Sequence, residues 1–131
     1  MIISGDVKKI TYNHPLLGSF TFFGKSGEDA NHMKGGLKAN DDDGNIGSNL
    51  ERIHQLNAYP WSFETTILAK PGAFDYLQSA TQSTEEGTLT VEYMDATVRT
   101  GTGNPVGDIQ ENKQAGTIAI KFVGSGTFEQ I

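Results

Sequence analysis

The sequence predicts a mainly β fold, an antiparallel β-sandwich or open barrel with one flanking α-helix and a long extended loop. Several segments alternate apolar and polar residues, as strands with one buried face do. The 16 glycines and 4 prolines suit a turn-rich β protein. One further segment has apolar residues at helical spacing. Together these observations predict a single β domain over residues 1–131.

The predicted strands are the segments with the clearest alternation. They cover residues 7–13, 19–23, 59–70, 88–94, 96–101 and 115–123. In the clearest one, residues 59–70, the side chains expected on the core face are those of Trp61, Phe63, Thr65 and Ile67. The glycine-rich residues 103–107 are expected to form a turn.

Residues 71–82 are predicted to form the helix. Pro71 suits the first helical position, and Asp75 lies near the positive end of the helix dipole. Ala73, Leu77 and Ala80 recur at helical spacing and form one apolar stripe. We therefore expect the helix to pack against the flank of the β-structure.

Residues 24–60 form a polar, glycine-rich stretch between two predicted strands. A compact domain rarely contains an irregular connection this long unless the connection has a function. The stretch has too few apolar residues to fold on itself. We therefore expect this loop to become ordered against another copy of the same chain.

The charge, the cysteine content and the hydropathy of the chain argue against several classes of protein. A formal net charge of −6 argues against tight nucleic-acid binding, which needs lysine and arginine at the phosphates. The chain has no cysteine, so disulfides and thiolate metal sites are excluded. The amino terminus lacks a signal-peptide pattern and no run is long enough to span a bilayer, so no membrane insertion is expected.

Candidate metal ligands are weak. Residues 41–44 (DDDG) match the middle of a calcium loop, but the first and last loop positions lack the carboxylates that calcium requires. A solvated turn or a subunit contact is favoured, with a loosely bound cation as the open alternative. His14, His32 and His54 show no spacing that brings two ligands to one face. We predict no metal site.

Candidate catalytic and sugar-binding residues are equally weak. Glu85, Glu86 and Asp95 could in principle pair as hydrolytic carboxylates, but acids on turns ordinarily face solvent. Trp61 and Phe63 could line a sugar site, although alternating aromatic residues in a strand usually belong to the core. We predict no catalytic residue and no cofactor, and hence not an enzyme.

Three sequence blocks, in this order, resemble the tail tube proteins of tailed bacteriophages, those of contractile tails most of all. The blocks are residues 36–46 (GLKANDDDGNI), 61–64 (WSFE) and 103–110 (GNPVGDIQ). The likeness runs from about residue 18 to the end, where residues 124–129 (GSGTFE) resemble an altered form of the family's ending. The resemblance implies a tail-tube-like β domain whose homohexameric rings stack into a hollow tube. It also implies that the loop at 24–60 reaches neighbouring subunits.

The same resemblance implies partners and location. The tube would be a structural part of the virion, assembled in the host cytoplasm, that conducts DNA during ejection without binding it specifically. A tape measure protein would occupy the lumen, and the further partners considered are sheath, baseplate and tail terminator proteins.

Two sets of residues are hypothesised to act in the tube. An acidic or neutral lining would repel phosphates, and the residues expected to line the lumen are Glu64, Thr66, Thr90 and Glu92. The residues expected at the contact between rings are Lys38, Asn40, Asp41, Asp42, Asp43, Asn45 and Ile46. An outward position for the first set is the alternative.

Three other functions compete with the phage tube. The nearest is the tube of a type VI secretion system or of a phage-derived bacteriocin, which has the same architecture and a different cargo. A more distant one is a carbohydrate-binding β-sandwich that uses Trp61 or Tyr93 as a stacking platform. An enzyme is the third, and it would need acids or histidines that only folding brings together.

Overall fold

The computed structural model describes residues 5–39, 48 and 56–131, and the described part is mainly β with antiparallel sheets and one helix, as predicted. Its elements are β1 (Val7–His14), β2 (Gly18–Phe22), β3 (Asn31–Met33), β4 (Gly36–Ala39), β5 (Leu56–Tyr59), β6 (Trp61–Leu68), α1 (Ala73–Thr81), β7 (Gly87–Tyr93), β8 (Val98–Pro105), β9 (Gln110–Asn112), β10 (Thr117–Gly124) and β11 (Glu129–Gln130). The short strands β3, β4, β9 and β11 were not predicted.

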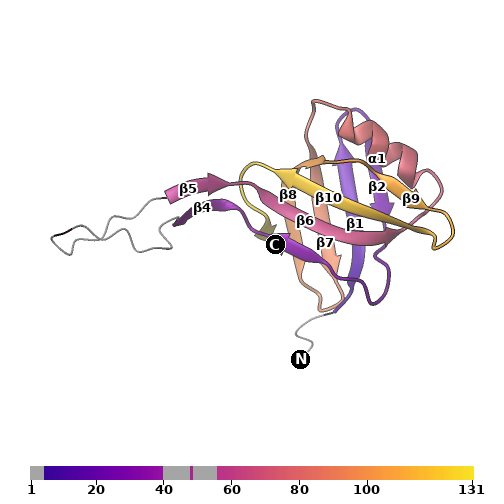
Figure 1. Ribbon diagram of the computed structural model, residues 1–131, viewed down its shortest axis with the longest axis horizontal. Coiled ribbons are helices and arrows are strands. Elements are labelled where there is room, and N and C mark those ends of the chain that lie inside the picture. Colours follow the sequence, from indigo (N-terminus) through magenta and orange to yellow (C-terminus); the bar gives the residue numbers. More distant parts are fainter. Residues whose placement is uncertain (1–4, 40–47, 49–55) are drawn as a thin grey trace.

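The main sheet folds into two layers, with strand order β2-β1-β7-β8-β10-β6-β3 (Figure 1). Strand β8 belongs to both layers, because it pairs with β7 along most of its length and with β10 at Asn104 and Pro105. The chain just after β2 returns to β6, where Gly24 bridges Ile67. The result is an open barrel rather than two separate sheets.

The core lies between the layers and consists of the inward residues of the alternating strands. On β6 the buried residues Trp61, Phe63 and Ile67 match the predicted core face. On β10 the buried residues are Ile118, Ile120 and Phe122. Ile10, Tyr12, Phe22, Leu89 and Val91 face them from the other layer.

The predicted turn at 103–107 is wrong for residues 103–105, because β8 continues through Pro105, and the chain bends only at Gly107, which has φ of +83°. Gly103, inside β8, makes room for the indole of Trp61. A Cβ on Gly103 would overlap the carbonyl oxygen of Val123 and lie 2.8 Å from Trp61 Cζ2. The indole Nε1 donates a hydrogen bond to the Thr102 carbonyl at 3.0 Å. Glycine here serves close packing of strands around one large side chain, not a change of direction.

Helix α1 lies over one end of the barrel (Figure 1) and begins two residues later than predicted. Gly72 precedes it with φ of +84°, a conformation that excludes it from the helix. Ala73, Leu77 and Ala80 are buried, which confirms the predicted apolar stripe. Tyr76 connects α1 to the sheet, because its hydroxyl lies 2.6 Å from the Gly18 carbonyl and 3.1 Å from the Tyr12 carbonyl.

The Tyr76 hydroxyl, which binds two backbone carbonyls, makes the free energy of unfolding depend on pH in the alkaline range. Burial, with a smaller contribution from Tyr12, raises the pKa of Tyr76 to about 12, whereas an unfolded tyrosine ionises near pH 10. The stabilisation is therefore complete below pH 10 and lost as the pH rises towards 12. We expect the free energy of unfolding to fall over this range, and to fall less in Tyr76→Phe. Urea titrations at several pH values measure how steeply the free energy of unfolding falls with pH in the unmodified chain and in Tyr76→Phe. Equally steep falls in the two chains would show that Tyr76 does not cause the pH dependence.

The segment 24–60 is not the irregular loop that was predicted, since much of its described part is β-structure. Strand β3 pairs with β6, and β4 pairs with β5 as a two-stranded ribbon. This β4–β5 ribbon projects away from the barrel (Figure 1). No helix in the described ranges is long and apolar enough to cross a membrane.

Candidate functional site

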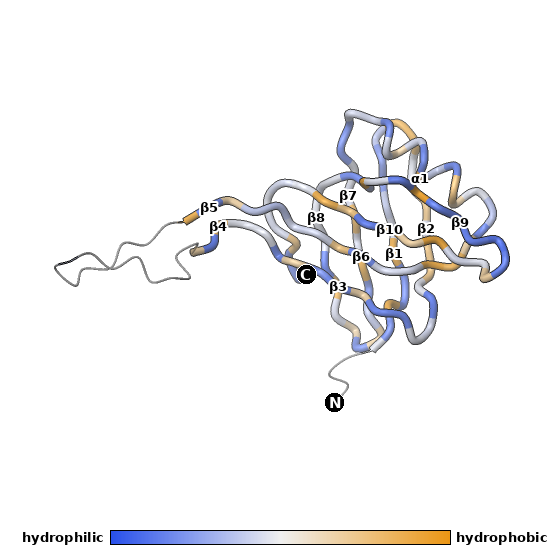
Figure 2. Tube along the Cα trace, in the orientation of Figure 1, coloured by the Kyte–Doolittle hydropathy of each residue, from blue (hydrophilic) through white to orange (hydrophobic). Residues whose placement is uncertain are grey.

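The β4–β5 ribbon has one apolar face. In its register Leu37 lies opposite Ala58, and Ala39 lies opposite Leu56. Directly paired residues and residues two apart share a face, so these four side chains form one surface. Leu37 is 70% exposed and Leu56 is 62% exposed. Figure 2 shows the β4–β5 ribbon lying outside the barrel. We call this surface, made of Leu37, Ala39, Leu56 and Ala58, the apolar ribbon face.

The opposite face of the ribbon is polar and carries Lys38, which was predicted to lie at a subunit contact. Lys38 pairs in register with Asn57. Its ammonium lies 5.9 Å from the centroid of the Tyr59 ring, a cation–π distance. The ribbon therefore presents different chemistry on its two faces.

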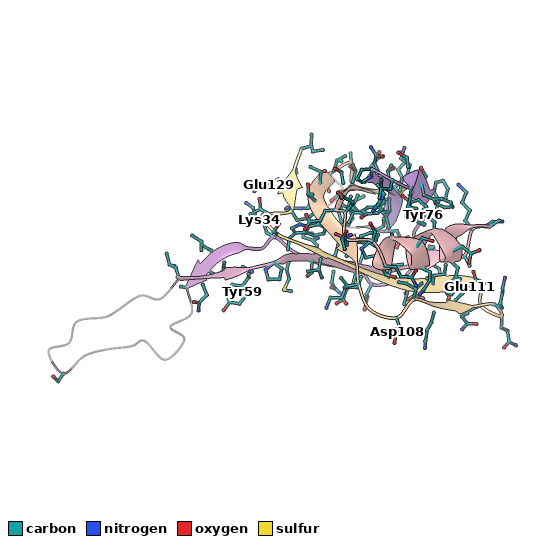
Figure 3. The ribbon with its side chains drawn as sticks, turned by 90° about the horizontal axis from the view of Figure 1, so that it is seen from above. Lys34, Tyr59, Tyr76, Asp108, Glu111 and Glu129 are labelled. Carbon is teal, nitrogen blue, oxygen red and sulfur yellow. The ribbon has the colours of Figure 1, made fainter. Side chains whose placement is uncertain are left out.

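The root of the ribbon is held firmly to the barrel. Gly35 bridges Thr127, and the Phe128 amide donates to the Lys34 carbonyl at 2.9 Å. Lys34 also pairs with Glu129 at 3.6 Å (Figure 3). Gly35 has φ of +77°, and a Cβ there would lie 2.6 Å from the backbone nitrogen of Trp61. These contacts set the direction in which the ribbon leaves the barrel.

His32 on β3 completes this root. Its Nδ1 lies 3.0 Å from the Tyr93 hydroxyl, and its ring packs edge-on against Phe128. Burial, and then the positive charge of Arg99, lower the pKa of His32. The lowered pKa favours the neutral ring in this packing.

A second exposed apolar surface lies at the other end of β6. Phe23 is 44% exposed and Leu68 is 46% exposed. The Leu68 amide donates to the Phe23 carbonyl at 2.9 Å, which makes the two residues neighbours. Strand β6 begins beside the ribbon, so its eight residues separate this Phe23–Leu68 patch from the ribbon by roughly 23 Å. The molecule thus has apolar surfaces at opposite ends.

The four residues predicted to line a lumen lie on two different layers. Glu64 and Thr66 occupy the outward face of β6, in register with Lys121 and Ala119 of β10. Thr90 and Glu92 occupy the outward face of β7, in the other layer. The fold does not bring the two pairs together, so a wall formed by one layer would contain only one of them.

Most of the predicted ring-to-ring residues lie outside the described residues. These are Asn40, Asp41, Asp42, Asp43, Asn45 and Ile46. The proposed calcium-loop residues 41–44 lie outside them as well, as does His54. Within the described ranges no group of three or more histidine, aspartate or glutamate residues could hold a metal ion.

The other histidine and the acidic candidates have structural surroundings. His14 is buried, with Nε2 3.0 Å from the Ser83 hydroxyl, and its Nδ1 accepts a hydrogen bond from the Leu16 amide at 3.1 Å.

The acidic candidates lie at opposite ends of β7. Glu85 and Glu86 precede the strand, whereas Asp95 follows it. A strand of seven residues separates them, so these carboxylates do not act as a pair.

The aromatic candidates for sugar binding are not free platforms. Trp61 is fully buried and stacks on Phe128 with ring centroids 5.0 Å apart. Phe63 is buried beside the same ring. Tyr93 is partly buried, and its hydroxyl is engaged by His32. The prediction that Trp61 and Phe63 belong to the core is confirmed.

The apolar ribbon face was missed from the sequence, although a signal for it was present. Leu37 and Ala39 stand two residues apart, as do Leu56 and Ala58. That is strand alternation on both flanks of a polar insertion, the pattern of two arms of one ribbon. The long separation between the arms hid their relationship.

Comparison with protein families and with curated proteins yields no match to this chain. The likeness to tail tube proteins therefore remains a prediction from the quoted sequence blocks.

Proposed function

We propose that this chain is the subunit of a phage tail tube, a structural virion protein whose homohexameric rings stack into a hollow conduit for DNA. The observation that carries the proposal is the projecting β4–β5 ribbon with its exposed apolar face. The sequence resemblance supplies the kind of assembly, and the ribbon supplies a physical reason for self-association.

An exposed ribbon of this kind favours a partner. A two-stranded ribbon is marginally stable alone in water, and each end of this one carries a leucine more than half exposed. Unpaired strand edges also invite pairing with another chain. Burying both leucines against a neighbour would stabilise the ribbon by about 1.5–3 kcal/mol for each side chain.

The two apolar surfaces suit a repeating contact. The ribbon leaves one end of β6, and the Phe23–Leu68 patch lies at the other end. The ribbon of one copy can cover the Phe23–Leu68 patch of a second copy. The second copy then still has its own ribbon uncovered, and the first still has its own patch uncovered. Such a heterologous contact propagates along an axis instead of closing into a dimer. Stacked rings are assemblies of that type.

The acidic composition suits a conduit for DNA. Asp and Glu number 16 against 10 Lys and Arg, so phosphates meet little attractive charge. A tape measure protein within the lumen, and terminator, baseplate and sheath proteins around the tube, would be its partners. A secretion or bacteriocin tube would use the same assembly with another cargo.

Electron microscopy of the purified protein tests the proposal. We expect stacked rings with a central hole, and a sedimenting fraction that grows with protein concentration. The type VI and bacteriocin alternatives predict the same particles and are separated by whether the tube copurifies from a DNA-filled virion. A monodisperse monomer at every concentration, above all one that binds glycans, would refute the tube.

A further inference from the structure

The outward face of the β2–β1–β7–β8 layer carries two rows of hydroxyl and amide side chains. Strand pairing aligns one row across all four strands, as Thr21, Thr11, Thr90 and Thr100. It aligns a second row as Ser19, Asn13, Thr88 and Thr102. We call this surface, made of the eight residues, the hydroxyl face.

The two rows contain no charged residue. Beyond them, Glu92 on β7 pairs in register with Lys9 and lies 3.6 Å from the Lys8 ammonium. At the outer edge of β8, Thr100 pairs with Glu129, which is bound to Lys34 at 3.6 Å. Both of these acidic groups therefore have a lysine beside them, and the Lys70 ammonium lies 3.5 Å from the Thr21 carbonyl at the β2 edge. The eight residues of the face itself carry no charge.

The other layer presents a different surface. On the outward side of β6 and β10, hollows of about 800 Å³ and about 240 Å³ meet at Thr66 and Ala119. The second hollow is lined by the acids Glu28, Asp29 and Glu64. This surface is uneven and charged, whereas the hydroxyl face is regular and its eight residues are uncharged.

We propose that the hydroxyl face forms the lumen wall of the tube, and that it passes a polyanionic cargo by being neutral and hydrated. This inference rests on the proposed function. Threonine and serine hydroxyls and asparagine amides hydrogen-bond water readily. Because the rows contain no lysine or arginine, DNA phosphates gain nothing there by releasing counterions. Of the four residues first expected in the lumen, Thr90 then belongs to the wall, Glu92 borders it, and Glu64 and Thr66 lie outside it.

The absence of cysteine makes this placement directly testable. Thr90→Cys places a thiol on the hydroxyl face, and the matched control Thr66→Cys places one on the other layer. Assembled tubes of each variant are treated with a small maleimide, or with a maleimide carried by a globular protein too wide for the lumen. We expect Cys at position 90 to react with the small reagent only, and Cys at position 66 to react with both. Free subunits should react with both reagents at both positions.

The possible outcomes separate the two proposals. If the unmodified chain forms no tubes, the proposed function fails, and this inference fails with it. If tubes form and position 90 reacts with the wide reagent, or with neither reagent, only the lumen assignment is overturned. Thr102→Cys, in the second row, provides the same measurement should Thr90→Cys prevent assembly.

Discussion

Replacing Leu37 and Leu56 together with aspartate is expected to abolish assembly while the barrel stays folded. Both side chains are exposed on the apolar ribbon face, so neither contributes to the core of the subunit. Losing the burial of two leucines, at about 1.5–3 kcal/mol each, weakens an intersubunit contact by about 10²- to 10⁴-fold. Sedimentation measures the loss of large particles. Fluorescence of Trp61, the only tryptophan, reports that the core is intact.

Asn57→Asp is the matched control for this experiment. It adds a negative charge to the same ribbon but on the polar face, beside Lys38. This variant should assemble nearly as well as the unmodified chain. Tubes formed by the Leu37→Asp/Leu56→Asp variant at the unmodified chain's concentration would show that the apolar ribbon face does not make the contact.

Gly124→Ala is expected to destabilise the subunit by about 3 kcal/mol or more, since the added methyl has no space to enter. Its Cβ would overlap the Thr102 carbonyl oxygen and lie 2.6 Å from Trp61 Nε1. It would therefore occupy the place of the hydrogen bond between those two groups. The nearest obstacles are a backbone atom and a fully buried indole, so neither can move aside cheaply. Urea unfolding followed by Trp61 fluorescence measures the change.

Ser125→Ala is the control for this prediction. Ser125 is the next residue and is exposed, so its truncation should change stability by no more than about 0.5 kcal/mol. A Gly124→Ala variant as stable as the Ser125→Ala variant would show that β8 and β10 can separate without cost. The packing of Trp61 against the strand glycines would then be unimportant for stability.

The strands of the barrel could be predicted because their signal is local. Alternation within β6 and β10 separates core residues from outward residues without knowledge of any partner strand. Trp61, Phe63, Ile118 and Phe122 are buried as their alternation indicates. The helix was predicted for the same reason, and only its first residues were misplaced, where Gly72 takes a left-handed conformation.

The role of the glycines could not be predicted, because glycine serves two opposite purposes. Gly72 has positive φ and lets the chain change direction before α1. Gly103 lies inside β8 and gives up a side chain so that Trp61 can pack there. In the sequence both are simply glycines near polar or proline residues, so residues 103–107 were taken for a turn.

Local residue patterns are enough to predict the antiparallel β class, the single helix and the inward side of the long strands, because these features depend on residues near one another in the chain. The observed strand pairing was needed to show that Leu37 and Leu56 share a face, and that Glu64 and Glu92 lie on different layers. Those relations depend on which strand pairs with which and in what register. Pairing is set by packing across the whole barrel, which no local pattern contains.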